Sequence, residues 1–146
     1  MSATNTFETA LLTLYFNNTD HANIGDAGGL QNSVSAGSFY VSLHTADPGE
    51  AGAQDTTEAT YTGYARVAVA RSSAGWTISA ANVSNAAAIT FGACTAGSDV
   101  ITDFGIGSDS TGAGNLFFKG ALTASRSISA GITPSFAIGE LDVNAD

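Results

Sequence analysis

The side chains of this sequence that could do chemistry are two histidines, a single cysteine and thirteen acidic residues. His44 lies just before Asp47, and serines are abundant, so a Ser-His-Asp arrangement can be assembled from the composition. A catalytic triad is recognised by its geometry, however, and no nucleophile motif such as G-x-S-x-G is present. A thiol nucleophile pair of Cys94 with His44 has no better support, and ordinary loop and strand-end positions explain His21 and His44. We therefore predict no catalytic residue and no enzymatic activity.

The acidic residues suggest two further kinds of chemistry. Paired carboxylates hydrolyse glycosidic bonds, but a glycosidase also needs a cleft lined by aromatic and polar groups, which nothing in the sequence indicates. Carboxylates also bind calcium, yet the ordered D-x-[DN]-x-[DN]-G loop and any Cys/His zinc spacing are absent. A structural calcium at a subunit interface stays an alternative to the prediction of no metal and no cofactor. The acids in question are Asp47, Glu50, Asp55, Glu58, Asp99, Asp103 and Asp109.

The net charge of −9 limits the partners of the chain, because only four residues are basic. Nucleic-acid binding requires basic side chains that displace counterions from phosphates, so we predict no nucleic-acid partner. An anionic membrane surface repels the chain for the same reason, and no apolar run approaches the roughly 18 residues of a transmembrane helix. The N-terminus lacks the basic region of a secretory signal, and Cys94 has no second cysteine to pair with. We predict folding in a reducing cytoplasm.

Two alternating segments flank a long acidic loop and predict the sheet that would position its side chains. In residues 39–44 and again in residues 64–71, side chains alternate with the period of two that is typical of half-buried strands. The Gly- and Thr-rich loop between them covers residues 45–63. Loops longer than about a dozen residues are uncommon and tend to be functional or disordered. A long loop on a rigid sheet suits contact with a partner better than catalysis.

The N-terminal segment predicts a helix, because five of its apolar residues recur at the helical period and form one stripe. Thr4 or Thr6 supplies the N-cap, and the asparagines that follow Phe16 mark the end. Leu12 and Phe16 widen the apolar surface beyond the stripe. The helix therefore either packs under the sheet or docks on a neighbouring subunit. The stripe consists of Phe7, Ala10, Leu11, Leu14 and Tyr15.

Residues 17–37 are rich in glycine and asparagine, which suppress regular structure, and they predict an extended arm. The arm either wraps over a partner or is exposed coil. Further along, residues 99–106 and 115–122 predict a hairpin, joined by the small polar residues of a turn at 108–112.

The whole pattern predicts a mainly β chain of about eight to ten strands. The expected fold is an antiparallel β-sandwich, jelly-roll-like, with one N-terminal helix and an extended N-terminal arm. The predicted division places the helix and arm in residues 1–37 and the β-sandwich domain in residues 38–146.

Several short motifs occur in an order that is specific to one group of proteins. FETALLTLYF lies near the start, followed by SLHTADPGEAG, GYARVAVAR, GWT, SNAAAITF, FGIG, GNLFFKGALT and ITPSFAIGEL. In these motifs the chain resembles a family of small tailed-bacteriophage proteins usually labelled phage tail fibre protein or phage structural protein. The resemblance covers nearly the whole chain. It implies a virion structural component and brings no catalytic or binding residues with it.

Two positions in the particle compete. Our main hypothesis is a head decoration or cement protein, a homotrimer that stabilises the capsid exterior by bridging neighbouring capsid subunits. Small size and an arm suited to wrapping favour it. The alternative is a tail fibre or tail-tip structural component, although fibre proteins commonly carry repeated shaft segments, which this chain lacks.

A different class of hypothesis is a carbohydrate-binding module that contacts host glycans at the tail tip. Trp76, Tyr61, Tyr64 and Tyr40 would provide the stacking surfaces, whereas the competing interpretation places Trp76 in the core. In every case the expected location is the virion, assembled in the host cytoplasm. The expected partners are other virion proteins, either the major capsid protein or tail proteins, and further copies of this chain.

Overall fold

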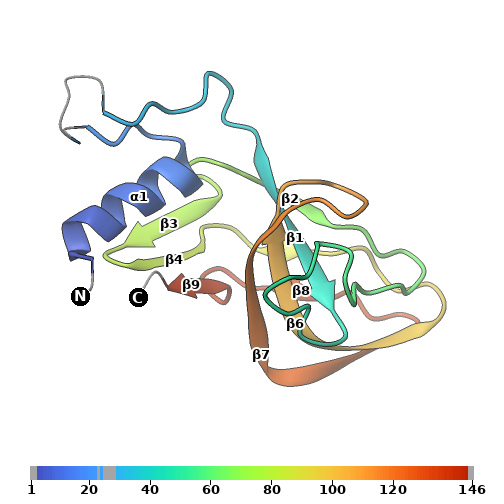
Figure 1. Ribbon diagram of the computed structural model, residues 1–146. Coiled ribbons are helices and arrows are strands. Elements are labelled where there is room, and N and C mark those ends of the chain that lie inside the picture. The colour runs from blue at the N-terminus through green and yellow to red at the C-terminus, as the bar shows by residue number, and fades with distance from the viewer. Residues whose placement is uncertain (1–2, 23, 25–28, 145–146) are drawn as a thin grey trace. The chain divides into compact units, whose positions relative to one another are not determined.

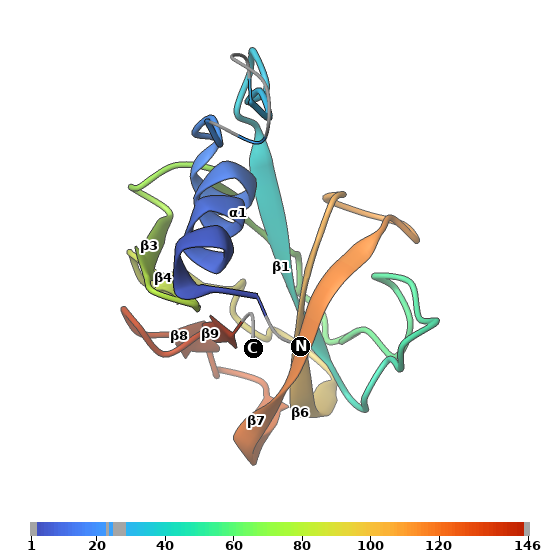
Figure 2. The ribbon, with the colours of Figure 1, turned by 60° about the vertical axis from the view of Figure 1, so that its left-hand side comes forward.

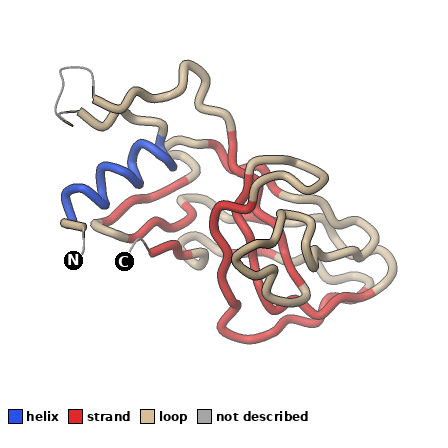
Figure 3. Tube along the Cα trace, in the orientation of Figure 1, coloured by secondary structure: helices blue, strands red, loops and turns tan. Residues whose placement is uncertain are grey.

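The computed structural model of the chain describes residues 3–22, 24 and 29–144, and most of its regular structure is strand (Figure 1). The predicted fold class is confirmed: the chain is mainly β, its sheets are antiparallel and consistent with a β-sandwich, and a helix lies near the N-terminus (Figure 3). The elements are α1 (Asn5–Asn17), β1 (Ser38–His44), β2 (Val67–Ala70), β3 (Trp76–Ser79), β4 (Asn82–Asn85), β5 (Ile89–Thr90), β6 (Ser98–Gly107), β7 (Leu116–Ser129), β8 (Ser135–Phe136) and β9 (Asp142–Asn144).

The chain divides into two compact units, each of which combines segments that are separated in the sequence. Unit 1 contains Met1–Ser38, Ala70–Ala88 and Phe136–Asp146, and unit 2 contains Phe39–Val69 and Ile89–Ser135. The division that the sequence predicts, at residue 37, groups the chain differently. In the structure two later segments join the N-terminal residues.

Helix α1 of unit 1 begins and ends as the sequence predicts. The side chain of Thr4 accepts a hydrogen bond from the Phe7 N–H, and Asn18 caps the C-terminus in the left-handed conformation with φ 52°. The helix buries Glu8, Leu12 and Phe16. The predicted stripe therefore does not face the core, because α1 is apolar on several sides and its periodicity does not identify the packed side. In the part of the chain that the structure describes, no helix is long and apolar enough to cross a membrane.

The core of unit 1 forms where α1 packs on the three-stranded sheet with the order β3-β4-β9 (Figure 2). Phe16 and Trp76 are fully buried, with ring centroids 4.9 Å apart at an interplanar angle of 67°. Arg71 ties the C-terminal end of α1 to the chain that follows. Its guanidinium donates to the carbonyl oxygens of Tyr15 at 2.7 Å and Ala36 at 3.1 Å. One carbonyl lies at the end of a helix and the other in a loop, where backbone groups lack the hydrogen-bond partners of regular structure.

Unit 2 is built on a four-stranded sheet with the order β2-β1-β6-β7. The predicted hairpin is confirmed as β6 and β7, with Phe104 opposite Gly120. The register shifts between Ile101 and Asp103, so the longer strand β7 bulges there and bends. β6 lies between β1 and β7 in the sheet and buries Ile101, Phe104 and Ile106.

Candidate functional site

The acidic loop of residues 45–63 folds back onto the sheet of unit 2. Within the loop the Thr45 N–H donates to the Thr57 carbonyl, and the Ala59 N–H ties the loop to β1 by donating to the Leu43 carbonyl, both at 2.8 Å. Further along, the Gln54 N–H donates to the Ala113 carbonyl at 2.7 Å. The loop covers the second face of β1, so this strand is buried on both sides rather than half-buried. It is an ordered element with fixed anchor points.

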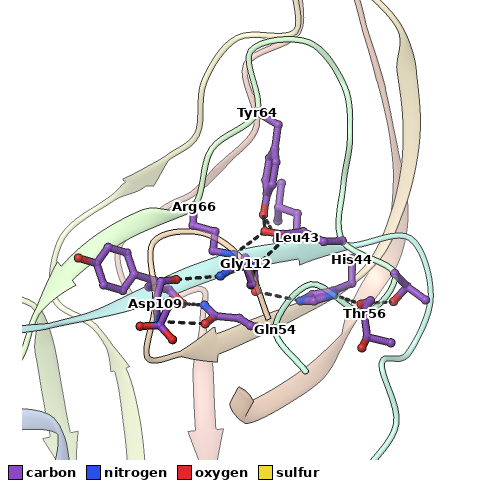
Figure 4. Close-up of polar contacts among 12 residues, drawn as sticks. Leu43, His44, Gln54, Thr56, Tyr64, Arg66, Asp109 and Gly112 are labelled. Carbon is purple, nitrogen blue, oxygen red and sulfur yellow. Dashed lines mark hydrogen bonds and ion pairs between the residues drawn. The ribbon is translucent and has the colours of Figure 1, made fainter. Parts of the chain in front are cut away.

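The central anchor of the loop is a buried ion pair between Arg66, which is labelled in Figure 4, and Glu58. The two side chains are 2% and 16% exposed. Arg66 donates Nε to Glu58 Oε1 at 2.6 Å and Nη2 to Oε2 at 2.7 Å, the bidentate geometry that suits a guanidinium and a carboxylate. It also donates to the carbonyls of Asp109 at 2.9 Å and Gly112 at 2.7 Å. One side chain thus holds the loop and the 108–112 turn together, and the hydrogen bonds to Glu58 raise the pKa of Arg66.

Gln54 provides a second anchor between the same two segments. Its side chain is fully buried, donates to the Tyr40 carbonyl at 3.0 Å and accepts from the Asp109 N–H at 3.1 Å. Gly107 leaves room for it, because a Cβ at that position would overlap the Gln54 side chain. Figure 4 shows the side chains of Gln54, Asp109 and Arg66 close together.

Tyr64 completes the polar network. Its hydroxyl donates to Glu58 Oε1 at 2.8 Å and accepts from the Leu43 N–H at 3.1 Å. Burial is the main cause that raises the pKa of this phenol. The polar groups buried in the network therefore have partners, which is the condition for a polar cluster to stabilise a core.

Ser42 and His44 form a serine–histidine pair in the same region, but not one that can act on a substrate. His44 Nδ1 donates to the Thr56 carbonyl at 2.8 Å, so Nε2 accepts the hydrogen bond from the Ser42 hydroxyl at 2.8 Å. Both residues are fully buried, so no substrate carbonyl can reach the hydroxyl. Asp47, which the sequence would place in a triad, instead pairs with Lys119 at 3.0 Å. The arrangement positions the loop.

The ionisation of His44 makes the loop sensitive to pH. Burial lowers the pKa of His44 below its ordinary value of 6.5, and Arg66 adds to this. The Thr56 carbonyl and the carboxylates of Glu58 and Asp103 oppose the shift without reversing it. Between the folded-state and the unfolded-state pKa of His44, the unfolded chain therefore binds more protons than the folded chain. The contribution of neutral His44 to the free energy of unfolding is complete above about pH 6.5 and is lost as the pH falls through the folded-state pKa.

We expect His44→Gln to destabilise the protein at pH 7.5 by about 1–3 kcal/mol, since buried partners of the imidazole lose their hydrogen bonds. The difference from the wild type should shrink as the pH falls below 6.5, the ordinary pKa of histidine. Urea unfolding at a series of pH values measures it, with His21→Gln as the matched control. A difference that is constant between pH 7.5 and pH 5 would show that His44 does not titrate as inferred.

Three of the remaining acidic candidates accept hydrogen bonds within the protein. Asp99 accepts the N–H groups of Thr60 and Tyr61 at 2.7 and 2.8 Å. Asp103 accepts from the Thr102 hydroxyl at 2.6 Å. Asp109 accepts from the hydroxyl of the neighbouring serine at 3.0 Å, and Asp55 is exposed. In residues 3–22, 24 and 29–144, no three or more His, Cys, Asp or Glu side chains gather as metal ligands would.

The aromatic residues proposed to stack on glycans are mostly inside the protein. Trp76 is fully buried, Tyr61 is 3% exposed, and the Tyr64 hydroxyl belongs to the buried network. The competing interpretation of Trp76 as a core residue is therefore the right one, whereas Tyr40 and Tyr64 are half-buried. Cys94 is also buried, at 1% exposed.

The outer side of the loop forms a shallow hollow that the sequence did not reveal. Gly49, Glu50 and Gly52 lie on one side and residues 116–119 of β7 on the other, around a volume of about 300 Å³. Lys119 lies between two acids, 3.0 Å from Asp47 and 3.1 Å from Glu50. In the sequence, the only sign of this hollow was Lys119, the single lysine of a strongly acidic chain. The hollow lies between the anchored loop and β7, the edge strand of the four-stranded sheet.

A family model described as "Podophage GP4 fiber I protein gp80" matches residues 2–144, which is nearly the whole chain. No curated protein matches the sequence.

Proposed function

The chain belongs to the family of the podophage GP4 fiber I protein gp80, and from that premise we propose that it is a non-enzymatic component of a tail fibre or tail tip. Membership makes it a phage structural protein and a component of the virion. The fibre description favours our alternative hypothesis over the head-decoration hypothesis, because nothing in it refers to the capsid. The match over residues 2–144 is the observation that carries the proposal.

The geometry of unit 2 supports a role in contact. The buried pair of Arg66 with Glu58 fixes the loop before any partner arrives, so little conformational entropy is lost on binding. Binding energy then comes from buried area, at roughly 25 cal/mol per Å² before association costs. Other tail proteins and further copies of this chain are the proposed partners. The acidic exterior disfavours nucleic acid and anionic membranes.

Stacking on host glycans is not part of the proposal, because Trp76 and Tyr61 are buried and the hydroxyl of the half-buried Tyr64 is engaged by Glu58 and Leu43. The buried Ser42 and His44 pair likewise supports positioning of the loop rather than hydrolysis. The proposed activity is mechanical: the protein offers a preformed surface to its neighbours.

A nonsense mutation in the gene, grown in a non-suppressing host, tests the proposal. We expect particles with DNA-filled heads that lack a fibre or tail-tip feature and adsorb about a hundredfold less well, since multivalent attachment is lost. Electron microscopy and adsorption assays measure both effects, and the protein supplied in trans is the control. Particles with complete tails but fragile or empty heads would instead support the head-decoration hypothesis and overturn this one.

A further inference from the structure

The tip of the acidic loop is a tight turn at residues 49–52, which we name the tip turn. Its two ends are glycines, and Gly49 has a positive φ of 76°. A Cβ at Gly52 would overlap the Pro48 carbonyl, so the turn requires glycine there. The Gly52 N–H donates to the Gly49 carbonyl at 3.3 Å, and the turn therefore closes on itself. Its two central residues, Glu50 and Ala51, are exposed.

The chain on either side of the tip turn is held by buried groups. Pro48 directly before it is buried, and Gln54 shortly after it is fully buried and hydrogen-bonded through its side chain. Further along the loop, Glu58 is held by the buried pair with Arg66. Local opening of a folded protein begins where few buried contacts and hydrogen bonds oppose it. The tip turn is therefore the part of the loop that can move while its anchors stay in place.

In the part of the chain that the structure describes, one polar contact joins the tip turn to another element. Glu50 Oε1 lies 3.1 Å from Lys119 Nζ on β7, and Asp47 holds the same ammonium at 3.0 Å. The side chains of Asp47 and Glu50 are 62% and 94% exposed. Exposed ion pairs contribute little to stability and are screened by salt. The contact between the tip turn and β7 is therefore weak and depends on ionic strength.

The space between the tip turn and β7 is not filled by side chains. It is the hollow of about 300 Å³ that Gly49, Glu50 and Gly52 line on one side and residues 116–119 on the other. Closely packed segments of a protein leave few voids larger than a water molecule. The tip turn thus bridges the hollow without packing on the strand, and the Lys119 contact holds it there.

We propose that the tip turn is a flap, which Lys119 clamps over the hollow and which opens when the ammonium releases Glu50. Opening removes one wall of the hollow and makes residues 116–118 of β7 more accessible. The surface that unit 2 presents therefore depends on ionic strength, whereas the buried anchors of the loop do not move. The inference goes beyond the fibre assignment and does not depend on it.

A glutamate-specific protease reports the position of the flap, because it cuts after Glu50 only when the closed turn opens into an extended segment. We expect Lys119→Met to be cut after Glu50 about two- to fivefold faster than the wild type, the range by which exposed ion pairs shift such an equilibrium. Mass spectrometry of the fragments measures the rate. Glu140, an exposed residue of unit 1, provides a reference cut in the same sample.

Arg126→Met is the matched control. It also removes one exposed cation from β7, but it leaves both partners of Lys119 in place. Its rate of cutting after Glu50 should equal that of the wild type. Circular dichroism confirms that both variants are folded before the protease is added.

Salt provides a second test, which needs no substitution. Raising the salt from about 20 mM to about 500 mM should speed the cut after Glu50 in the wild type, because it screens the contact with Lys119. The same change should leave Lys119→Met unaffected, since its clamp is already absent. Dividing each rate by that of the cut after Glu140 removes the effect of salt on the protease itself.

Faster cutting after Glu50 in Lys119→Met and in salt-treated wild type, but not in Arg126→Met, supports the flap. Equal rates in Lys119→Met and the wild type overturn it, as does a bond after Glu50 that stays intact in both while Glu140 is cut. A salt effect of the same size in Lys119→Met and in the wild type also overturns it, because the response would not pass through Lys119.

Discussion

Replacing Arg66 by methionine is expected to lower the free energy of unfolding by about 3–5 kcal/mol, because it leaves the buried carboxylate of Glu58 without its cation. The loss includes the bidentate contacts at 2.6 and 2.7 Å and the hydrogen bonds to the carbonyls of Asp109 and Gly112. Methionine retains apolar bulk, so the effect reports on the polar network more than on a cavity. Urea unfolding followed by circular dichroism measures it.

Two comparisons make the Arg66 prediction specific. The double variant Arg66→Met with Glu58→Met should recover much of the loss, since it removes the stranded charge as well as its partner. Lys119→Met should have little effect, because its partners Asp47 and Glu50 are 62% and 94% exposed. If Arg66→Met costs no more than Lys119→Met, the ion pair does not anchor the loop.

Trp76→Ala is the second substitution with a large expected effect, a loss of about 3–5 kcal/mol. Trp76 is fully buried in unit 1, and its ring lies 4.9 Å from that of Phe16 between the sheet and α1. Truncation leaves a cavity under the helix, where the surrounding side chains relax only in part. Because Trp76 is the only tryptophan, circular dichroism rather than fluorescence should follow unfolding.

Ile138→Ala is the matched control for Trp76→Ala, because Ile138 is also an apolar residue of unit 1 but is 69% exposed. Its expected cost is within about 0.5 kcal/mol. Amide hydrogen exchange of Trp76→Ala should accelerate in β3 and β4. Equal stability of the two variants would mean that the contact between Trp76 and Phe16 does not hold unit 1 together.

The sequence predicted the elements whose signals are local. The ends of α1 follow from Thr4 and the asparagines after Phe16, and the β6–β7 hairpin follows from alternation on either side of a polar turn. The sequence did not identify the packed side of α1, because Phe7 and Leu11 are as apolar as Leu12 and Phe16. A periodic pattern identifies a side only when the other sides are polar.

Features that depend on contacts between distant segments could not be predicted from the sequence. The grouping of Ala70–Ala88 and Phe136–Asp146 with the N-terminal residues depends on contacts between distant segments. The loop at 45–63 was correctly predicted as long and irregular, but nothing local showed that it is anchored. Its signal was Arg66, a cation in an alternating apolar segment, which in a core must be paired. The partner Glu58 was among the acids considered, but for catalysis rather than for packing.

The position of the protein on the virion tests the central claim most directly. Virions labelled with a gold-conjugated antibody against the purified protein can be imaged, and the place of each gold particle recorded relative to the head and tail. The account predicts label on the tail fibres or the tail tip. Label distributed over the capsid surface, with the tail unlabelled, would contradict it.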